Sequence, residues 1–465
     1  MILPSDFVNH LKQHINQADK VLDALTQPSN TSIRHNVSKT KNAFDLKHLE
    51  QIAWAENGYY LSQRPLFTVD PFFQSGYYYV QEAGSMFIGE IIKQLGLNKS
   101  TVCGLDLCAA PGGKSTHVLS MLQPESVLVS NEIIKTRTPV LIDNLIKWGL
   151  PNYIVTQSDA RKFGLLPALF DFILCDAPCS GEGMLRKSND ALHHWSLNNV
   201  NLCAQRQQRI VHDVWPSLKS GGYFIYATCT FNVIENEENI TSFTETLPAN
   251  SIKLQTQNGI VESITKNKNG HLVYGYRLMP GLVNAEGLFI AVFQKSEAVP
   301  NNLSRIKSPA IKTGHYKNWL AQPVANFQNT WVVTNDLKIA LVEKLINAVY
   351  IKSYGPEVLS QNLQPLPALA YLPDFNTDAL PHLGLDYLNS LRYLQGHTRF
   401  DNDNIPDGFV LVKYKGQTDV PLGFAKKTNN RFNNLLPKSS YIKMQLDKLD
   451  LSEQLLFPFI PLAVR

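Results

Sequence analysis

The stretch LDLCAAPGGKS, residues 105–115 of this 465-residue chain, decides the fold. It runs from an apolar, strand-like segment through Gly112 and Gly113 into a segment whose apolar residues have helical spacing. A glycine-rich turn between a strand and a helix lets the backbone approach a ligand closely. The stretch therefore predicts a Rossmann-like α/β domain that binds a cofactor at this turn.

Outward from the turn, short apolar runs alternate with amphipathic ones, which is typical of a mostly parallel, doubly wound sheet. The expected strands cover residues 102–107, 126–131, 152–157, 171–176, 223–228 and 287–294. Helices are expected over 82–95 and around 118–122 and 210–218. The length favours about three domains. Composition divides the chain into an N-terminal lobe (1–95), the α/β core (96–296), a linker with a proline-containing segment (297–390) and a basic last block (391–465).

The turn also matches the end of the phosphate-binding motif G-x-x-x-x-G-K-[ST] at Gly113, Lys114 and Ser115. The first glycine of that motif falls on Cys108, however, and Pro111 interrupts the loop. A nucleoside triphosphatase is therefore disfavoured.

Three of the next strands end at an acid: Glu132, Asp159 and Asp176. Ligands of doubly wound sheets bind at the carboxyl ends of the strands, and an acid about 20 residues after the turn can accept hydrogen bonds from ribose hydroxyls. Glu132 has this spacing. A single acid after a strand is often a helix N-cap, an alternative that weighs most for Asp159. Three such acids without a G-x-G-x-x-G motif favour S-adenosylmethionine over a dinucleotide.

Two of the six cysteines follow strands beside the same crevice: Cys179 in DAPCSGEG (176–183) and Cys229 in ATCT (227–230). A buried cysteine is more often an apolar filler than a nucleophile. Yet C5 of a pyrimidine needs activation before it can take a methyl group, and a thiolate that adds to C6 supplies it. Asp176 is then expected to hydrogen-bond the edge of the base. The residues alone leave open which thiol attacks.

The composition describes a folded protein with 44% hydrophobic and 18% charged residues. The net charge of +4 hides a gradient, from −1 over residues 1–300 to +5 over residues 301–465. Between Leu411 and Lys443, seven basic residues face only Asp419, which is also the pattern of an ordinary solvated surface. The chain has no apolar run of 18 residues, no signal peptide and too few cysteines for a disulfide framework, so we expect a cytoplasmic protein with reduced thiols.

Taken together, LDLCAAPGGKST, DAPCSGEG and ATCT resemble the Sun-type RNA 5-methylcytosine methyltransferases. Three further stretches narrow the resemblance to members that methylate cytosine 1407 of 16S rRNA in the small ribosomal subunit: RPLFTVDPFFQSGYYYVQEAGSM, GFVLVKYKG and PLGFAKKTNNRFNNLLPKS. The resemblance covers nearly the whole chain. It implies a class I S-adenosyl-L-methionine-dependent methyltransferase core, an N-terminal RNA-binding lobe and a C-terminal PUA-like RNA-binding domain.

The resemblance also implies roles for single residues. Cys229 would be the nucleophile, Cys179 would assist resolution of the covalent adduct, and Lys114 and Asp176 would lie at the reacting base. The implied cofactor-binding residues are Cys108, Ala109, Ala110, Pro111, Gly112, Gly113, Lys114, Glu132, Asp159 and Asp176. The cofactor is S-adenosyl-L-methionine, and no metal is implied.

Basic residues of the last block are expected to contact the RNA backbone, which positions RNA without reading its sequence. These residues are Lys413, Lys415, Lys426, Lys427 and Arg431. Tyr77 to Tyr79 of the first lobe either hold RNA or belong to the core. We expect a monomer that acts on 16S rRNA. Two alternatives stay open: the same chemistry on tRNA or another rRNA site, and an inactive ribosome-assembly RNA-binding protein.

Overall fold

The computed structural model describes residues 3–40, 46, 48–187, 195–296, 313–314, 318–401, 404–416, 418–446, 455–456 and 460–461. Its largest element is a ten-stranded sheet with the strand order β10-β11-β12-β8-β7-β4-β5-β6-β16, in which β9 also pairs with β12. The parallel strands are β4 (Cys103–Asp106), β5 (Val127–Asn131), β6 (Tyr153–Thr156), β7 (Phe170–Asp176) and β8 (Leu218–Thr228). Because β4 lies between β5 and β7, the strand order reverses at β4, and ligands of such sheets bind at this switch point.

An antiparallel extension continues the sheet beyond β8. It consists of β9 (Ala249–Ser251), β10 (Val261–Lys266), β11 (Leu272–Leu278) and β12 (Leu288–Lys295). The sequence predicts β12 but not β9, β10 or β11. The reason is visible in β10, whose residues alternate between half-buried and exposed and so form no apolar run.

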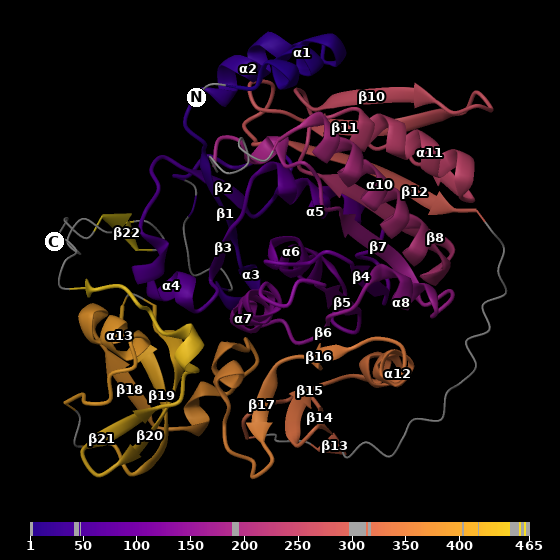
Figure 1. Ribbon diagram of the computed structural model, residues 1–465. Coiled ribbons are helices and arrows are strands. Elements are labelled where there is room, and N and C mark those ends of the chain that lie inside the picture. Colours follow the sequence, from indigo (N-terminus) through magenta and orange to yellow (C-terminus); the bar gives the residue numbers. More distant parts are fainter. Residues whose placement is uncertain are drawn as a thin grey trace.

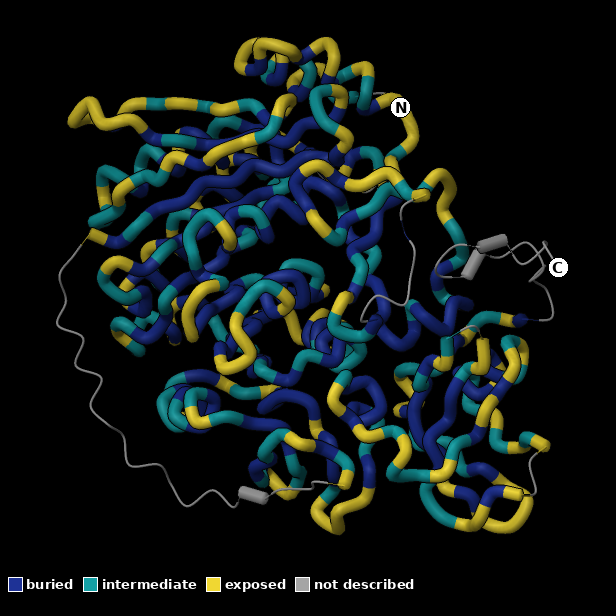
Figure 2. Tube along the Cα trace, turned by 180° about the vertical axis from the view of Figure 1, so that it is seen from behind, coloured by how far each residue is buried: buried dark blue, intermediate teal, exposed yellow. Residues whose placement is uncertain are grey.

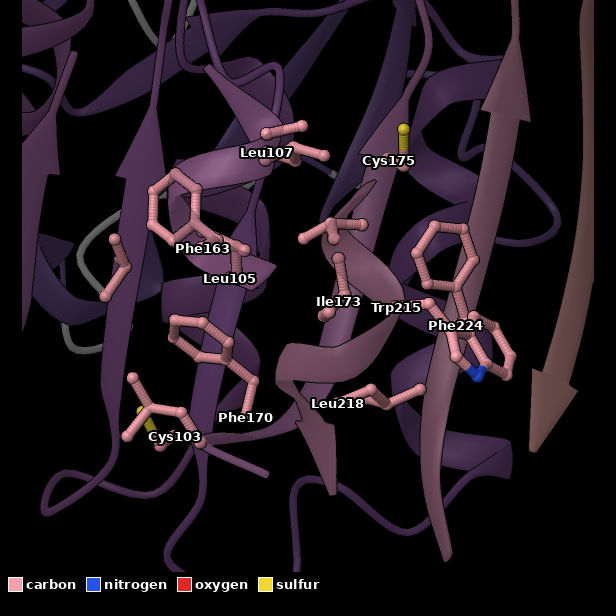
Figure 3. Packing of buried hydrophobic residues seen from close by; sticks show 14 of the residues in the cluster. Cys103, Leu105, Leu107, Phe163, Phe170, Ile173, Cys175, Trp215, Leu218 and Phe224 are labelled. Atoms are coloured by element: carbon pink, nitrogen blue, oxygen red, sulfur yellow. The ribbon is translucent and has the colours of Figure 1, made fainter. Parts of the chain in front are cut away.

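Helices cover both faces of the sheet (Figure 1). One face packs against α5 (Phe87–Gln94), α6 (Gly113–Met121) and α7 (Thr138–Trp148), and the other against α8 (Ala160–Gly164), α10 (Leu197–Val214) and α11 (Asn239–Thr246). Neighbouring residues of one strand face opposite layers, because side chains alternate along a strand. Figure 3 shows the second layer, where Leu105 and Ile173 pack near Phe163 of α8. The predicted doubly wound α/β core is confirmed.

The N-terminal lobe contains α1 (Ser5–His14), α2 (Ala18–Leu25), α3 (Val37–Thr40), α4 (Pro71–Gln74) and a sheet of β1 (Thr31–His35), β2 (Gly58–Leu61) and β3 (Tyr78–Val80). The C-terminal sheet contains β18 (His382–Leu385), β19 (Gly408–Tyr414), β20 (Val420–Thr428) and β21 (Arg431–Asn434), with α13 (Tyr387–Leu394) beside it. Both sheets contribute to one hydrophobic core, in which Tyr77 and Tyr78 are buried. These two tyrosines are therefore core residues.

The segment between the core and the C-terminal sheet contains β13 (Thr313–Gly314), β14 (Val324–Phe327), β15 (Thr330–Val333), α12 (Asp336–Leu345), β16 (Ile351–Ser353) and β17 (Glu357–Ser360). β16 pairs antiparallel with β6, and Leu341 and Leu345 of α12 join the hydrophobic core of the large sheet. This part of the predicted linker region thus packs on the α/β core. Most of the predicted polar linker, 296–317, lies outside the described residues.

Burial follows these layers, since the central strands of the large sheet are buried and the outer loops and the β10 edge are exposed (Figure 2). In the described residues, no helix has the length and apolar character that a bilayer crossing needs.

Candidate active site

The turn after β4 is held in place from several sides. Gly112 is the N-cap of α6 with φ +110°, and a Cβ at this position would lie 3.2 Å from Cδ1 of Leu141. The loop carbonyls accept hydrogen bonds from distant side chains: Arg137 Nη2 donates to Ala110 O at 2.5 Å and Asn144 Nδ2 donates to Pro111 O at 2.9 Å. The loop is therefore fixed by the protein itself, as a preorganised binding loop requires.

Asn131 links three strand ends next to this loop. Its side-chain nitrogen donates to Leu107 O and to Ser158 O, each at 3.0 Å, and its side-chain oxygen accepts from the Thr156 hydroxyl at 2.9 Å. These bonds tie together the carboxyl ends of β4, β5 and β6, which form one wall of the crevice.

Two buried carboxyl groups face this region. Asp106, at the end of β4, accepts from the Ser115 hydroxyl at 2.6 Å, and burial raises its pKa to about 7. Glu132 follows β5, is buried, and accepts from the backbone N–H of Ile134 through Oε1. Its other oxygen has no hydrogen bond among the described residues and lies 3.4 Å from Arg137 Nη1 in an ion pair. Glu132 thus retains a hydrogen-bond acceptor beside the loop.

Asp159 lies at the end of the loop after β6. Its side chain caps α8 by accepting from the Arg161 N–H at 3.1 Å, and it forms an ion pair of 3.4 Å with Arg209 of α10. The helix-capping alternative raised by the sequence therefore describes the contacts that Asp159 makes here.

Lys114 and Asp176 meet at the carboxyl edge of the parallel strands. The Lys114 ammonium lies 2.8 Å from Oδ2 of Asp176, and both side chains are partly buried. Burial by itself would lower the pKa of Lys114, but the charge and hydrogen bond of Asp176 and the nearby Cys229 sulfur raise it above its ordinary value. The crevice therefore contains a fixed positive charge next to one thiol.

The two cysteines that follow β7 and β8 converge on the same point. The sulfur atoms of Cys179 and Cys229 are 3.1 Å apart, and both residues are half-buried. The hydrogen bond with Cys229, together with burial, raises the pKa of the Cys179 thiol well above its usual value. The raised pKa favours the protonated form of Cys179, and either sulfur can be the donor in the contact.

The other cysteines have different surroundings. Burial raises the pKa of Cys103, at the opposite end of β4, to about 12, and Cys175 is buried inside the sheet (Figure 3). Cys108 in the turn after β4 is hydrogen-bonded to Cys175, which together with burial raises its pKa well above the ordinary value. Among the described residues, no three metal-ligating side chains converge on one point.

The five basic residues predicted to contact RNA do not share one surface. Lys426 and Arg431 are exposed, and Lys415 is exposed but forms an ion pair with Asp419 at 2.7 Å. Lys413 and Lys427 are each only 7% exposed: Lys413 Nζ contacts His382 Nδ1 at 3.3 Å, and Lys427 Nζ donates to Ile405 O. The predicted backbone contact is corrected for these two lysines, because alternation along β19 and β20 turns their side chains inward.

Comparison with known proteins matches three parts of the chain. Residues 95–294 match the family 16S rRNA methyltransferase RsmB/F, residues 3–83 match the N-terminal domain of 16S rRNA methyltransferase RsmF, and residues 381–440 match the methyltransferase RsmF PUA domain. The chain belongs to the RsmB/F family of methyltransferases. Its match to the RsmF PUA domain begins at the edge of β18, ahead of the boundary at residue 391 that composition suggests.

Relatives in the RsmB/F family align along most of the chain. Ribosomal RNA small subunit methyltransferase F of Aeromonas salmonicida is 28% identical over 94% of this chain and 96% of its own length. The protein of the same name from Escherichia coli O157:H7 is 33% identical over 64% of this chain and 63% of its own. The crystal structure of a methyltransferase homolog protein from Pyrococcus horikoshii is 25% identical with a TM-score of 0.53, over 63% of this chain and 95% of that one. The predicted methyltransferase core with a C-terminal PUA domain is confirmed.

The predicted loop, Glu132, Asp176, Lys114 and the two cysteines thus gather at one edge of the sheet, whereas the basic block lies in a different sheet. Sequence reasoning missed Asp106, Asn131 and Arg137, which shape the loop. It also missed Arg34 of β1, a buried residue that donates to Thr116 Oγ1 at 2.6 Å behind the loop. Asn131 ends a predicted strand, as Asp176 does, and Asp106 is the next-to-last residue of another, so their position near strand ends was an available signal. No feature of the sequence indicates the positions of Arg34 and Arg137.

Proposed function

We propose that this protein is an S-adenosyl-L-methionine-dependent RNA cytosine-C5 methyltransferase that forms 5-methylcytosine at position 1407 of 16S rRNA. The observation that carries the proposal is the pair of half-buried thiols, 3.1 Å apart, beside the ion pair of Lys114 and Asp176. Methylation of an amine or a hydroxyl needs no thiol, whereas methylation at a pyrimidine C5 needs a nucleophile that adds to C6.

The residues of the cofactor loop fit S-adenosyl-L-methionine. The turn from Cys108 to Lys114 leads into the N-terminus of α6. Oε2 of Glu132 pairs with Arg137 but accepts no hydrogen bond among the described residues, and it suits a ribose hydroxyl. The carboxylate of Asp159 caps α8 and pairs with Arg209, and it can still accept a further hydrogen bond. When bound, the cofactor supplies an electrophilic methyl group on a sulfonium.

Cys229 is the nucleophile in this proposal. The thiolate is the attacking form of a cysteine, and a nearby cation favours it. The Lys114 ammonium is close enough to interact electrostatically with the Cys229 sulfur. The two sulfurs are also within hydrogen-bond distance, so a Cys179 thiol can donate to a Cys229 thiolate. The raised pKa of Cys179 suits the other role, that of a proton-carrying partner.

The thiol chemistry then proceeds through a covalent adduct. The Cys229 sulfur bonds to C6, the C5=C6 electron pair moves to C4–C5, and the C4=N3 pair moves to N3. N3 then takes up a proton, and the proton held by Cys179 is its source. With the cofactor bound, C5 would then take the methyl group: the C4=C5 electron pair forms the new C–C bond, the C4=N3 bond re-forms, and the bond from the methyl carbon to the sulfonium sulfur breaks with its electron pair left on sulfur. The Cys179 thiolate accepts the C5 proton, the C5=C6 bond re-forms, Cys229 leaves as a thiolate, and N3 returns its proton to the solvent. One proton is released overall, which balances the methyl cation transferred.

Asp176 and Lys114 act on the base edge in this scheme. A carboxylate at Asp176 accepts hydrogen bonds from N3–H and the exocyclic amine of the adduct, and so stabilises the charge that develops there. Lys114 holds this carboxylate through the 2.8 Å contact. Its charge also favours the departing thiolate.

The rRNA substrate is supported by the relatives, whose name is ribosomal RNA small subunit methyltransferase F. The target base must leave its stack to reach the thiols, at a cost of about a few kcal/mol. The N-terminal lobe and the C-terminal PUA domain share one core, so they can act as one RNA-binding body. We propose that the protein works as a monomer in the cytoplasm.

The deciding experiment maps 5-methylcytosine by bisulfite sequencing in rRNA from cells that lack the gene and from cells complemented with variants. We expect loss of the mark at position 1407, restored by the wild type and by Cys103→Ala, a thiol control remote from the crevice. Cys229→Ser should not restore it. Loss of 5-methylcytosine in tRNA or at another rRNA position would mean that this other RNA is the substrate. An unchanged methylation map would overturn the enzyme assignment.

A second measurement separates the two thiols. Cys179→Ser should accumulate a protein–RNA adduct that survives denaturing gel electrophoresis, because the adduct forms but is not resolved. An adduct that appears only when Cys229 is replaced would reverse the two roles.

A further inference from the structure

A hydrogen-bonded bridge lies directly behind the two thiols. Ser180 and Thr230 are the residues that follow Cys179 and Cys229, and their hydroxyl oxygens are 2.9 Å apart. Ser180 contacts the carboxylate of Glu235 twice: its hydroxyl donates to Oε1, and its backbone N–H donates to Oε2 at 3.0 Å. Glu235 is thus connected to both cysteine loops through one serine.

Gln207 of α10 extends the bridge to the residue before Cys179. Its side-chain nitrogen donates to Oε2 of Glu235 at 2.8 Å and to Pro178 O at 3.0 Å. The amide is held from behind, because its oxygen accepts from the Tyr226 hydroxyl at 2.9 Å and from Asn239 Nδ2 at 2.8 Å. Both neighbours of Cys179 are therefore fixed by the same group of buried side chains.

The next residue, Asn236, does the same for Cys229. Its side-chain nitrogen donates to Thr230 O at 2.9 Å, and its oxygen accepts from the Thr228 hydroxyl at 2.6 Å. Glu235 and Asn236 are consecutive residues of a π-helical turn, Ile234–Glu238, that precedes α11. Such turns often occur at functional sites, and here the turn directs two adjacent side chains at the two cysteine loops.

The carboxylate at Glu235 is expensive to maintain. Glu235 is fully buried, and within the described part of the chain no Lys, Arg or His forms an ion pair with it. Burial raises its pKa to about 7. An apolar side chain would suit a purely structural position better, since an unpaired buried carboxylate costs folding free energy.

We propose that Glu235 is a positioning residue for methyl transfer, which keeps the Cys179 and Cys229 loops at the spacing that lets the two thiols share a proton. It acts through Ser180, Gln207 and the Ser180–Thr230 bridge and does not touch the base. The inference rests on the proposed function for its meaning, but the thiol spacing itself can be measured without RNA.

The hydrogen-bond donors around Glu235 predict that glutamine can replace it. Both N–H donors, from Ser180 and Gln207, point at Oε2, whereas Oε1 contacts only the Ser180 hydroxyl. In Glu235→Gln the amide oxygen can occupy the Oε2 position, and the amide nitrogen can donate to the Ser180 hydroxyl, which then donates to Thr230. The bridge survives without the charge. Glu235→Ala removes the bridge and leaves buried hydrogen-bond donors unpaired.

The test measures single-turnover methyl transfer for Glu235→Gln, Glu235→Ala and the control Glu238→Ala, which removes an exposed glutamate from the same turn. We expect the alanine variant to lose about 100-fold in rate, the effect of misplacing reacting groups by about 1 Å. The glutamine variant should stay within about three-fold of the wild type, as should the Glu238 control. Thermal unfolding of each variant shows whether it is folded at the assay temperature.

Phenylarsine oxide provides a readout of thiol spacing that is independent of methylation, because its arsenic bonds to two neighbouring thiols with release of water. Wild type and Glu235→Gln should bind it tightly, whereas Glu235→Ala should bind about ten-fold more weakly, approaching Cys179→Ser. If Glu235→Gln were as slow as Glu235→Ala, the positioning role would be overturned, because methyl transfer would then require the negative charge of Glu235. Wild-type arsenical affinity in folded Glu235→Ala would also overturn it. If Cys229→Ser still methylates RNA, the proposed function fails, while the arsenical result still decides the role of Glu235.

Discussion

The catalytic crevice and the C-terminal sheet both contain lysines, but they surround them in different ways. Lys114 in the crevice is paired with the carboxylate of Asp176 and lies near a thiol. In the C-terminal sheet, Lys427 is buried against a backbone carbonyl, while Lys426, its neighbour in β20, is exposed. The same residue type therefore pairs with an acid beside a thiol in one region, and in the other is either buried against the backbone or faces the solvent.

The difference follows from sheet geometry. Parallel strands bring their carboxyl ends to one edge, so residues that follow separate strands converge on one crevice. An antiparallel strand such as β20 turns successive side chains to opposite faces, so residues adjacent in sequence separate. Substitutions in the crevice should therefore change the rate of methyl transfer, and those in the C-terminal sheet should change stability or RNA affinity.

The largest effect is expected for Lys114→Met, which keeps the length of the side chain but removes its charge. The substitution leaves Asp176 without its partner and Cys229 without the nearby cation. We expect the single-turnover rate to fall by about 10²–10³-fold, as when one charge-stabilising group is removed from a preorganised site.

The matched control is Lys93→Met on α5, which breaks an exposed ion pair with Glu56. Its rate should stay within about two-fold of the wild type, because exposed pairs contribute little. If Lys114→Met were as active as this control, the crevice would not use its charge, and the contrast with the C-terminal sheet would disappear.

Much of the crevice could be predicted from sequence, because residues that follow the strands of a parallel sheet all lie at the same edge of that sheet. The turn at Gly112, the acids after β5 and β7, and the thiols after β7 and β8 all follow apolar runs, and the parallel sheet brings them to one edge. Arg34 and Arg137 could not be predicted, because their contacts with α6 and the loop depend on packing between elements. The surface of the basic block could not be predicted either, because a count of charged residues does not show that Lys426 is exposed and Lys427 is buried.

A smaller effect is expected for Glu132→Ala, which tests whether the strand-end acids differ. Both acids accept from a backbone N–H and pair with an arginine, but Oε2 of Glu132 accepts no hydrogen bond among the described residues, whereas both oxygens of Asp159 accept from Arg209. Loss of one or two hydrogen bonds to a ribose should weaken cofactor binding by about ten-fold, at about 1.4 kcal/mol for each factor of ten. Isothermal titration with S-adenosyl-L-methionine measures this, and Asp159→Asn should lose less. Equal losses would mean that both acids bind the cofactor.

Within the C-terminal sheet, Lys427→Met and Lys426→Met should separate stability from binding. Lys427→Met leaves the Ile405 carbonyl without its buried donor, so we expect the free energy of unfolding to fall by about 1–3 kcal/mol. Lys426→Met changes an exposed residue whose ammonium lies 5.6 Å from the centre of the Phe409 ring, and should change stability by about 0.5 kcal/mol or less. Denaturant unfolding of both proteins checks this, and equal stabilities would contradict the inward position of Lys427.

The smallest effect is expected when two exposed basic residues of the C-terminal sheet, Lys426 of β20 and Arg431 of β21, are both replaced by Met. Lys415 is left in place because Asp419 already neutralises it. Each lost phosphate contact should reduce the slope of log affinity against log salt by about 0.7–0.9, so two contacts remove about 1.4–1.8. The single-turnover rate at saturating RNA should remain within about two-fold of the wild type, because the crevice is unchanged. An unaltered salt slope would mean that this surface does not contact RNA. A slower rate at saturation would mean that the two regions are coupled, and that the C-terminal sheet helps to present the base.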